Sequence, residues 1–303
     1  MTRSSGAGSG GALGAALEVV RAGALVTVQD LGRPGYAHVG VPLSGALDRG
    51  AHVLANRLLG NPPGAATLET TLDGVGLRAL APVTVAVTGA PCPVRVAGRP
   101  AAWGAPVLVP AGAVLEVGRA VRGVRSYVGV RGGIAVPEVL GSRSADLLSG
   151  LGPAPLAVGG ELAVGGAAGA VGEIPGVDVL PVVGPPGELV LPVVPGPRDD
   201  WFEGAAEALA RGGYRVSPAS NRIGLRTEGG PPLVRSPIGA GELPSEGMVL
   251  GAVQVPPDGM PVVFLADHPV TGGYPVVGVV PRRALDAAAQ ARPGTPVVFV
   301  PVR

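Results

Sequence analysis

The chain has 303 residues, of which 47% are hydrophobic and only 3% aromatic, with 52 glycines and 34 prolines. This composition supplies enough apolar surface for one large domain or two smaller ones, and it favours short strands and frequent turns over long helices. All 23 residues counted as Lys+Arg are arginine, which excludes a Walker phosphate loop, a Schiff-base lysine and a biotin-accepting lysine.

The remaining global properties exclude further classes of function. A net charge of +1 attracts no nucleic acid, and no arginine cluster is interleaved with aromatic residues. No apolar run reaches the roughly 20 residues that span a bilayer, because Gly, Pro or a charge intervenes each time. The single cysteine, Cys92, excludes an internal disulfide. We therefore expect a cytoplasmic protein in a reducing compartment that contacts neither nucleic acid nor membrane.

In chain order, residues 1–16 are expected to form a flexible leader, because small residues dominate and a strong apolar segment is missing. Short β-like runs bounded by Gly or Pro follow, at spacings that suit antiparallel barrels or sandwiches. These predicted strands span 25–28, 83–88, 106–109, 114–117, 124–130, 177–183, 188–194, 248–255, 261–265, 275–280 and 296–300. Apolar spacing and Gly or Pro stops predict three helices, at 47–59, 201–211 and 282–291.

A Gly/Pro-rich stretch at 183–187, followed by PGP at 195–197, is the predicted junction between two domains. The N-terminal domain then spans 17–184 and the C-terminal domain 185–303. Just before the junction, the low-complexity segment 158–172 is expected to be a loop or a hairpin. The sequence thus predicts a mainly β protein of two domains with a few short helices.

Polar residues gather among glycines in four clusters, and the first is QDLGRPGY at 29–36. Here Gln29, Asp30 and Arg33 follow a predicted strand into a tight turn. One interpretation is an Asx-type turn in which Asp30 binds local amides. The other is functional, because the planar guanidinium of Arg33 suits a carboxylate or a phosphate.

The second cluster is a stripe on the first predicted helix, formed by Asp48, His52 and Asn56 at intervals of four residues. An Asp and a His one turn apart suit a metal ion. A third strong ligand is missing nearby, since His38 lies in a different loop. A solvated or hydrogen-bonded helix face is therefore the favoured interpretation, and we predict no metal.

The other two clusters lie in the C-terminal half. SNRIGLR at 220–226 carries Asn221 and two arginines around a glycine, which fits either an exposed strand end or a binding site. ADHPVTGGYP at 266–275 follows an apolar run and joins an Asp–His pair to Thr271, two glycines and Tyr274. A plain turn needs only the glycines, so we interpret this segment as functional, with bare amides that can cradle an oxyanion.

Motifs that mark common mechanisms are absent from the sequence. It contains no G-x-S-x-G elbow, no H-E-x-x-H, no paired C-x-x-C and no phosphate loop. The usual hydrolase, zinc and nucleotide mechanisms therefore lack their residues. If the reaction needs ATP, we expect another polypeptide to bind it.

Together, the polar runs resemble the biotin-dependent carboxyltransferase/5-oxoprolinase C-subunit family, which is also called allophanate hydrolase subunit 2 or KipA-like. The resemblance covers nearly the whole chain after about Leu17, in order, and its motifs are long enough to be specific. The matching runs are VQDLGR (28–33), GVPLSGALD (40–48), ANRLLGN (55–61), LETT (68–71), PGP (195–197), SNRIG (220–224), SEG (245–247), GAVQVP (251–256) and DHPVTGGYP (267–275).

The resemblance implies two cyclophilin-like β-barrel domains whose polar clusters meet in a cleft between them. It also implies one component of an ATP-dependent 5-oxoprolinase, which opens the lactam of 5-oxoproline to L-glutamate. The expected partners are the other two components, a KipI-like B-subunit and a LamB/YcsF-like A-subunit, with no cofactor bound by this chain alone and ATP used in the complex. The sequence departs from the family pattern at His268, where many relatives have another residue, which leaves a catalytic role for His268 open, and at His52.

On this hypothesis Arg33 or Arg222 binds the substrate carboxylate, while amides from the 271–273 segment stabilise the oxyanion. The expected catalytic residues are Asp267, His268, Thr271, Gly272 and Gly273. The expected substrate-binding residues are Arg33, Asn221, Arg222, Gln254 and Tyr274. Structural or cleft-lining roles are expected for Gln29, Asp30, Asp48, Asn56 and Glu246.

Two further hypotheses stay open. The chain could carry out carboxyl transfer from carboxybiotin to urea or a related amide, with a separate biotinylated carrier because this chain has no acceptor lysine. Alternatively, it could be a non-enzymatic partner that binds the inhibitor of a kinase. Urea has no carboxylate, so the two enzymatic hypotheses differ on whether an arginine is needed for the substrate.

Overall fold

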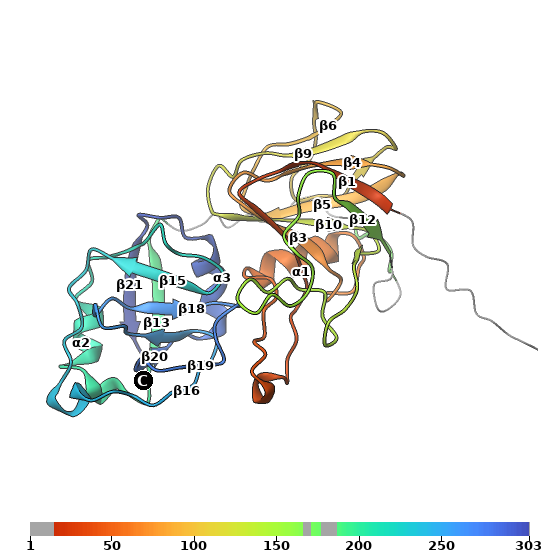
Figure 1. The fold of residues 1–303 in the computed structure, drawn as a ribbon. Helices are drawn as coiled ribbons and strands as arrows, with labels where there is room; N and C mark the ends of the chain where they lie inside the picture. The colour runs from red at the N-terminus through yellow and green to blue at the C-terminus, as the bar shows by residue number, and fades with distance from the viewer. Residues whose placement is uncertain (1–14, 166–170, 177–186, 303) are drawn as a thin grey trace, which may run out of the picture.

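A computed structural model describes residues 15–165, 171–176 and 187–302. The described chain is mainly β, as predicted, and Figure 1 shows two groups of strands side by side, one from each half of the sequence. The predicted junction at 184/185 and the predicted strand at 177–183 lie outside the described residues, as does nearly all of the expected leader. Strand β1 begins at Ala15, so the last two residues of that expected leader lie in a strand.

The N-terminal half consists of two antiparallel sheets that share one apolar core. Within the described residues one sheet has the strand order β11-β12-β1-β4-β9-β6-β7 and the other β2-β3-β10-β5-β8. The strands are β1 (Ala15–Ala22), β2 (Leu25–Gln29), β3 (Thr67–Thr71), β4 (Val75–Ala79), β5 (Val83–Gly89), β6 (Val94–Val96), β7 (Arg99–Pro100), β8 (Val107–Val109), β9 (Val114–Val117), β10 (Arg125–Val130), β11 (Ile134–Ala135) and β12 (Glu161–Val164). Two helical segments accompany them, η1 (Ala37–Val39) and α1 (Arg49–Leu58).

The C-terminal half closes into a barrel in the order β13-β20-β17-β18-β15-β14-β21. Its strands are β13 (Leu189–Pro195), β14 (Tyr214–Val216), β15 (Gly224–Glu228), β17 (Ala252–Gln254), β18 (Val262–Phe264), β20 (Val276–Val279) and β21 (Pro296–Pro301). A two-stranded ribbon, β16 (Glu246–Gly247) with β19 (Thr271–Gly272), lies outside the barrel ladder. The helical segments are η2 (Asp199–Trp201), α2 (Ala205–Ala210), η3 (Pro237–Ala240) and α3 (Arg282–Gln290).

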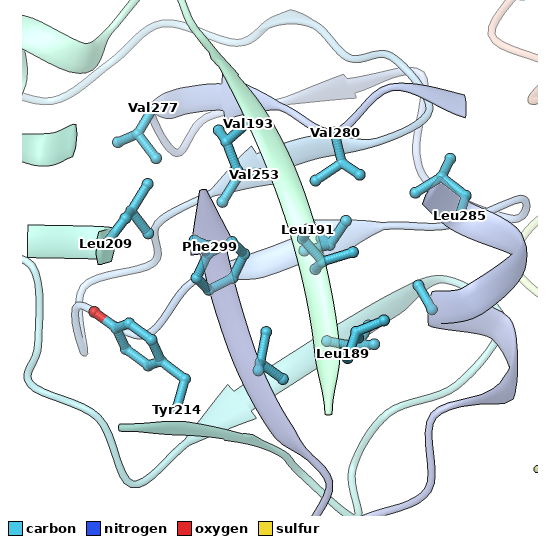
Figure 2. Close-up of a cluster of buried hydrophobic side chains, with 14 of the residues drawn as sticks. Leu189, Leu191, Val193, Leu209, Tyr214, Val253, Val277, Val280, Leu285 and Phe299 are labelled. Atoms are coloured by element: carbon cyan, nitrogen blue, oxygen red, sulfur yellow. The ribbon is translucent and has the colours of Figure 1, made fainter. Parts of the chain in front are cut away.

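Branched aliphatic side chains fill the barrel because the chain has few aromatic residues to supply volume. Figure 2 shows this core, in which Leu209 of α2 and Leu285 of α3 approach the strand side chains from different sides. Tyr214 and Phe299 meet edge to face with ring centroids 5.6 Å apart. Side chains from the strands, α2 and α3 therefore form one continuous apolar cluster in the barrel.

The helix predictions are largely confirmed. Helix α1 falls inside the predicted 47–59, and α3 matches 282–291 to within one residue. The predicted helix 201–211 is divided, because Gly204 adopts a left-handed φ of 55° between η2 and α2. The predicted strand 248–255 shortens to β17, since Gly251 turns the chain at φ 84°, where a Cβ would lie 2.2 Å from the Val280 carbonyl oxygen.

Two other predictions need comment. The low-complexity segment 158–172, expected as a loop or hairpin, contains strand β12, which pairs with both β1 and β11. The cyclophilin-like assignment of the two halves stays a prediction. In the described parts of the chain no helix has the length and hydrophobicity that a membrane span requires.

Candidate functional site

The two halves meet around a buried group of charges that we call the interface ion cluster: Arg222, Asp267, Glu69 and Arg125. Arg222 Nε and Nη2 donate to the two carboxylate oxygens of Asp267 at 2.8 and 2.9 Å. The remaining Nη1 donates to Glu69 Oε1 in the other half. All three of these side chains are at most 1% exposed. The guanidinium thus joins carboxylates from both halves, and each of its three nitrogens donates a hydrogen bond within the protein.

The carboxylates of the interface ion cluster are also satisfied by neighbouring groups. Asp267 accepts from Ser44 Oγ at 2.8 Å and from the Leu147 amide at 3.2 Å. Glu69 Oε2 accepts from Tyr127 Oη at 2.7 Å and from the Leu47 amide at 3.0 Å. The strand end that carries Asp267 is therefore tied to the N-terminal half at several points.

The pKa values of the cluster show that its charges support one another. Burial alone would lower the pKa of Arg222, but Glu69 and Asp267 outweigh it and hold that pKa above its usual value. Burial would raise the pKa of Glu69, yet Arg222 and Arg125 keep it below its usual value. We therefore treat the cluster as two cations facing two anions in a dry interface.

Asp48 and Gln290 form a second bridge between the halves. Asp48 caps α1 by accepting from the Ala51 amide at 2.9 Å, and its other oxygen accepts from Gln290 Nε2 at 2.7 Å. Gln290 lies at the end of α3, and its oxygen accepts from the amides of Val124 and Arg125. Burial raises the pKa of Asp48 to about 6 in spite of these bonds. The role expected for Asp48 is thus structural, at the interface.

The other two residues of the predicted helix stripe are buried and engaged by protein groups. His52 Nδ1 lies 2.9 Å from Thr67 Oγ1, and Nε2 lies 3.1 Å from the Pro63 carbonyl. Asn56 donates to the Ala65 carbonyl at 2.7 Å. Burial lowers the pKa of His52 to about 4. The stripe is a hydrogen-bonded helix face, and among the described residues no group of three or more His, Cys, Asp and Glu side chains could hold a metal ion.

The pKa shifts of the two buried residues His52 and Asp48 predict opposite pH dependences of the free energy of unfolding. The pKa of His52 falls from 6.5 to about 4. Its contribution to the free energy of unfolding is therefore fully present above pH 6.5 and is lost as the pH falls toward 4. The pKa of Asp48 rises from 3.8 to about 6, so its contribution is present below pH 3.8 and lost as pH rises toward 6. Each shift corresponds to about 3 kcal/mol, so the two largely cancel in the wild type.

A variant that lacks one of these two titrating groups should show the pH dependence that the other one causes. Relative to wild type, we expect the free energy of unfolding of His52→Gln to increase as pH falls from about 6 to 4, and that of Asp48→Asn to decrease. Urea unfolding curves across this range measure both trends. Parallel profiles for wild type and the two variants would show that neither group titrates as described.

The first polar cluster forms a rigid turn. Asp30 Oδ1 accepts from the Gly32 amide at 2.8 Å, which is the Asx-type arrangement, and also from Ser142 Oγ at 2.7 Å. Gly32 has a φ of 83°, and a Cβ there would lie 2.4 Å from the Leu43 carbonyl. The predicted local role of Asp30 is thus observed, and the turn needs glycine at position 32.

Three buried polar atoms near this turn have no hydrogen-bond partner within the described residues: Gln29 Oε1, Arg33 Nη1 and Asp146 Oδ2. Arg33 is 1% exposed, and its Nη2 donates to the Ser144 carbonyl. Asp146 is 3% exposed, and its Oδ1 accepts from the amides of Leu148 and Ser149 at 2.9 and 3.1 Å. Burial lowers the pKa of Arg33, and Asp146 is the carboxylate that opposes this most strongly. An unused donor and an unused acceptor are therefore both buried near this turn.

A cavity of about 420 Å³, which we call the cleft cavity, opens between the halves, and its lining includes residues that follow Arg33 and Asp146 in the sequence. Its walls come from three segments, and a buried polar residue precedes each. Arg33 precedes the 37–42 wall, Asp146 the 148–149 wall and His268 the 269–271 wall. The loop that carries η1 projects from the N-terminal half to form the first wall (Figure 1). This is where the predicted clusters from the two halves come together.

His268 has a defined tautomer in this wall. Its Nδ1 donates to the Pro269 carbonyl at 2.8 Å, which leaves Nε2 as the basic nitrogen. The ring stacks on Phe264 with centroids 5.8 Å apart, and burial lowers its pKa. A neutral imidazole is therefore held in place beside the cleft cavity at neutral pH.

The 271–274 segment separates two cavities. Thr271 lines the cleft cavity, whereas Gly273 and Tyr274 line a cavity of about 540 Å³ on the barrel side. Thr271 and Gly272 form β19 and pair with β16, so this stretch is a strand and not a loop of bare amides as expected. Gly272 packs against the Gln254 side chain, since a Cβ there would lie 2.9 Å from Gln254 Nε2.

The remaining predicted residues are dispersed. Gln254 is 6% exposed and donates to the Tyr274 carbonyl at 3.2 Å. Asn221 Oδ1 accepts from the amides of Ile223 and Gly224, which is a local turn on the surface. Glu246 forms an ion pair with Arg198. None of these three contacts extends to the cleft cavity.

Two residues of the interface and one of the cleft cavity were missed from sequence. Glu69 stands in the LETT run and Tyr127 in a predicted strand, but neither pattern indicates that the side chain points at the opposite half. Asp146 lies in a loop segment with no motif at all. The observation that draws attention to Asp146 is its buried Oδ2 atom, which has no hydrogen-bond partner among the described residues.

Comparisons with known proteins agree with this two-part arrangement. The carboxyltransferase domain family, subdomain A and B, matches residues 39–301. The C-subunit of the 5-oxoprolinase of Escherichia coli (strain K12) is 36% identical over 288 residues, which are 94% of this chain and 90% of that protein. The similarity therefore runs through both halves and the interface between them.

Two solved structures have the same fold. The K. lactis urea amidolyase superposes with a TM-score of 0.88 at 30% sequence identity, over 97% of this chain and 19% of that one. The protein TTHA0988 superposes with a TM-score of 0.83 at 36% identity, over 94% of this chain and 56% of that one. This chain thus spans little more than half of TTHA0988 and about a fifth of the urea amidolyase.

Proposed function

This chain belongs to the carboxyltransferase domain family of subdomain A and B type, and we propose that it is the C-subunit of an ATP-dependent 5-oxoprolinase that opens 5-oxoproline to L-glutamate. The observation that carries this proposal is the extent of similarity to the Escherichia coli C-subunit, which covers 94% of this chain and 90% of that protein. In the urea amidolyase, by contrast, the similar region is 19% of a much longer chain. The similarity to the C-subunit therefore extends over nearly the whole of both chains, whereas the similarity to the urea amidolyase does not.

We place the substrate in the cleft cavity, between the segments that follow Arg33, Asp146 and His268. A lactam presents its carbonyl oxygen and its N–H on the same side of one bond. The unused donor of Arg33 and the unused acceptor of Asp146 complement that pair, the first toward the carbonyl and the second toward the N–H. Binding would thus satisfy two buried groups that the protein leaves unpaired.

The chemistry proposed for the cavity is addition of water to the lactam carbonyl carbon, followed by cleavage of the C–N bond and protonation of the nitrogen. His268 Nε2 is a basic nitrogen next to the 269–271 wall, and a lowered pKa keeps it neutral and able to accept the proton of water. ATP would drive the reaction in the complex with the two partner proteins. This chain contributes the substrate site.

Arg222 and Asp267 receive a different role from the one expected. Their side chains are directed at each other and at the opposite half, so we assign them to positioning the strand end that carries His268. Substrate binding by Arg222 would require breaking buried hydrogen bonds, of which it makes four. The substrate contact that was expected of Arg33 or Arg222 is therefore not assigned to Arg222, and of these two arginines Arg33 has the unpartnered nitrogen, Nη1.

A second candidate function is carboxyl transfer to urea or a related amide, which is favoured by the TM-score of 0.88 to the urea amidolyase. Urea also presents a carbonyl oxygen beside an N–H, so the same Arg33 and Asp146 atoms would serve it. That reaction needs a separate biotinylated carrier, since this chain has no lysine. A streptavidin blot of the purified assembly distinguishes the two functions.

Reconstitution tests the proposal directly. We expect the chain purified with its two partner proteins to consume 5-oxoproline and release glutamate in proportion to ATP hydrolysed, and each preparation alone to be inactive. Glutamate and phosphate release are the measurements. Turnover of urea with a biotinylated companion would favour carboxyl transfer, and tight association without turnover of either substrate would favour a regulatory role.

A further inference from the structure

A second concave surface lies between the helices that face each other across the two halves (Figure 1). This arginine groove has a volume of about 620 Å³. Helix α1 lines it with Arg49, Val53, Leu54 and Arg57, and α3 lines it with Arg282 and Arg283. The groove is separate from the cleft cavity, and no role proposed above uses it.

The positive charge of the arginine groove is not compensated. Asp286 is the one carboxylate along its lining, and it accepts from the backbone amides of Arg49 and Gly50 at 3.1 and 3.2 Å. In the described parts of the chain, the ion pairs involve other arginines, such as Arg78 and Arg119. Four guanidinium groups against one carboxylate leave a net charge of about +3 in the groove, counting one unit for each group.

The arginines also repel one another. Burial lowers the pKa of Arg282, and the charge of Arg49 lowers it further. Val53 and Leu54 also line the groove, and both are partly exposed, so part of the groove surface is apolar. Like charges gathered around an apolar floor are unfavourable for the protein alone, and an anion with an apolar part would relieve both conditions.

We propose that the arginine groove binds a nucleoside polyphosphate, with the arginines on the phosphates and Val53 and Leu54 against the base. The volume lies within the range of small-molecule sites, about 300–1,000 Å³. Guanidinium forks from two helices suit a chain of phosphates, which offers several oxyanions in a row. This goes beyond the proposed function, in which the nucleotide was expected on another chain because this one lacks a phosphate loop. The groove would supply contacts that such a loop otherwise makes.

Calorimetric titration of the full chain without partners tests the proposal, with ATP and inorganic tripolyphosphate as probes at fixed ionic strength. We expect wild type to bind both, ATP more tightly. The double variant Arg57→Gln with Arg283→Gln should lose about tenfold or more in affinity for both probes, as removal of two charge-assisted contacts predicts. Leu54→Ala should weaken ATP only. The double variant Arg95→Gln with Arg99→Gln, on the exposed β6–β7 hairpin, is the matched control and should bind as wild type.

Three results would overturn the proposal. The first is absence of binding of either probe to wild type, and the second is an equal loss in the groove and hairpin variants, which would indicate general charge attraction. The third is failure to bind either probe while the groove variant loses a co-purifying partner, because the groove would then be a protein interface. None of these readouts depends on turnover, so they leave the proposed 5-oxoprolinase activity to its own test.

Discussion

Arg222→Met is expected to lower the free energy of unfolding by about 3–5 kcal/mol, because it leaves two buried carboxylates without their cation. Methionine preserves most of the side-chain volume but none of the hydrogen bonds to Asp267, Glu69 and the Gly45 carbonyl. Since these groups come from both halves of the chain, the loss should also weaken the association of the halves. Urea unfolding followed by circular dichroism measures the change.

Matched variants separate this effect from a general loss of charge. Arg226→Met makes the same substitution four residues later, at an exposed position, and should change stability by less than about 0.5 kcal/mol. Arg222→Lys keeps the charge but not the planar fork and should lie between the two. If Arg222→Met does not fold, Arg222→Lys still gives a measurable loss.

The interaction between Arg222 and Asp267 can also be tested. In the double variant Arg222→Met with Asp267→Asn, one of the two uncompensated charges is removed, while Glu69 keeps Arg125 as a neighbour at 3.6 Å. We expect the double variant to be more stable than Arg222→Met alone. Simple additivity of the two single losses would mean that Arg222 and Asp267 do not interact as described.

The pairing of Arg222 with Asp267 shows what can and what cannot be predicted from the sequence. The runs that hold these two residues were both singled out because polar residues among glycines are unusual in a chain with 15% charged residues. The run that holds Asp267 was interpreted as functional, and the run that holds Arg222 as an exposed strand end or a binding site. Their spacing of 45 residues carries no information on pairing, so an internal ion cluster looked like a pair of ligand-binding groups. Burial, which decides between these roles, is a tertiary property.

The fold shows the same division between local and long-range information. Helix α1 was predicted because its apolar spacing and the stop at Gly60 are local. Strand β3 was missed because TLETT looks polar, yet four of its five residues are buried between β2 and β10. Glu69 is one of those residues, and its burial is compensated by Arg125 of its own half and by Arg222, which approaches from the other half.

Asp146→Asn is expected to reduce kcat/KM for 5-oxoproline in the reconstituted complex by about 10²–10³-fold with little change in stability. The amide oxygen can replace Oδ1, which accepts from the Leu148 and Ser149 amides, so the loop is preserved. The other position changes from the unpartnered acceptor Oδ2 to an NH₂ donor. A donor there faces the lactam N–H, which is also a donor. Asp258→Asn, in an exposed turn, is the matched control and should be as active as wild type.

A substrate analogue makes this prediction specific to the hydrogen bond. In the corresponding lactone, a ring oxygen replaces the N–H, so the acceptor of Asp146 has no donor to meet. Wild type should therefore be inhibited more strongly by a lactam than by the lactone, and Asp146→Asn should lose or reverse that preference, because its NH₂ can donate to the ring oxygen. A merely structural role for Asp146 would weaken both inhibitors equally. Unchanged kinetics and an unchanged lactam-to-lactone ratio would remove Asp146 from the site and shift attention to the barrel-side cavity lined by Tyr274.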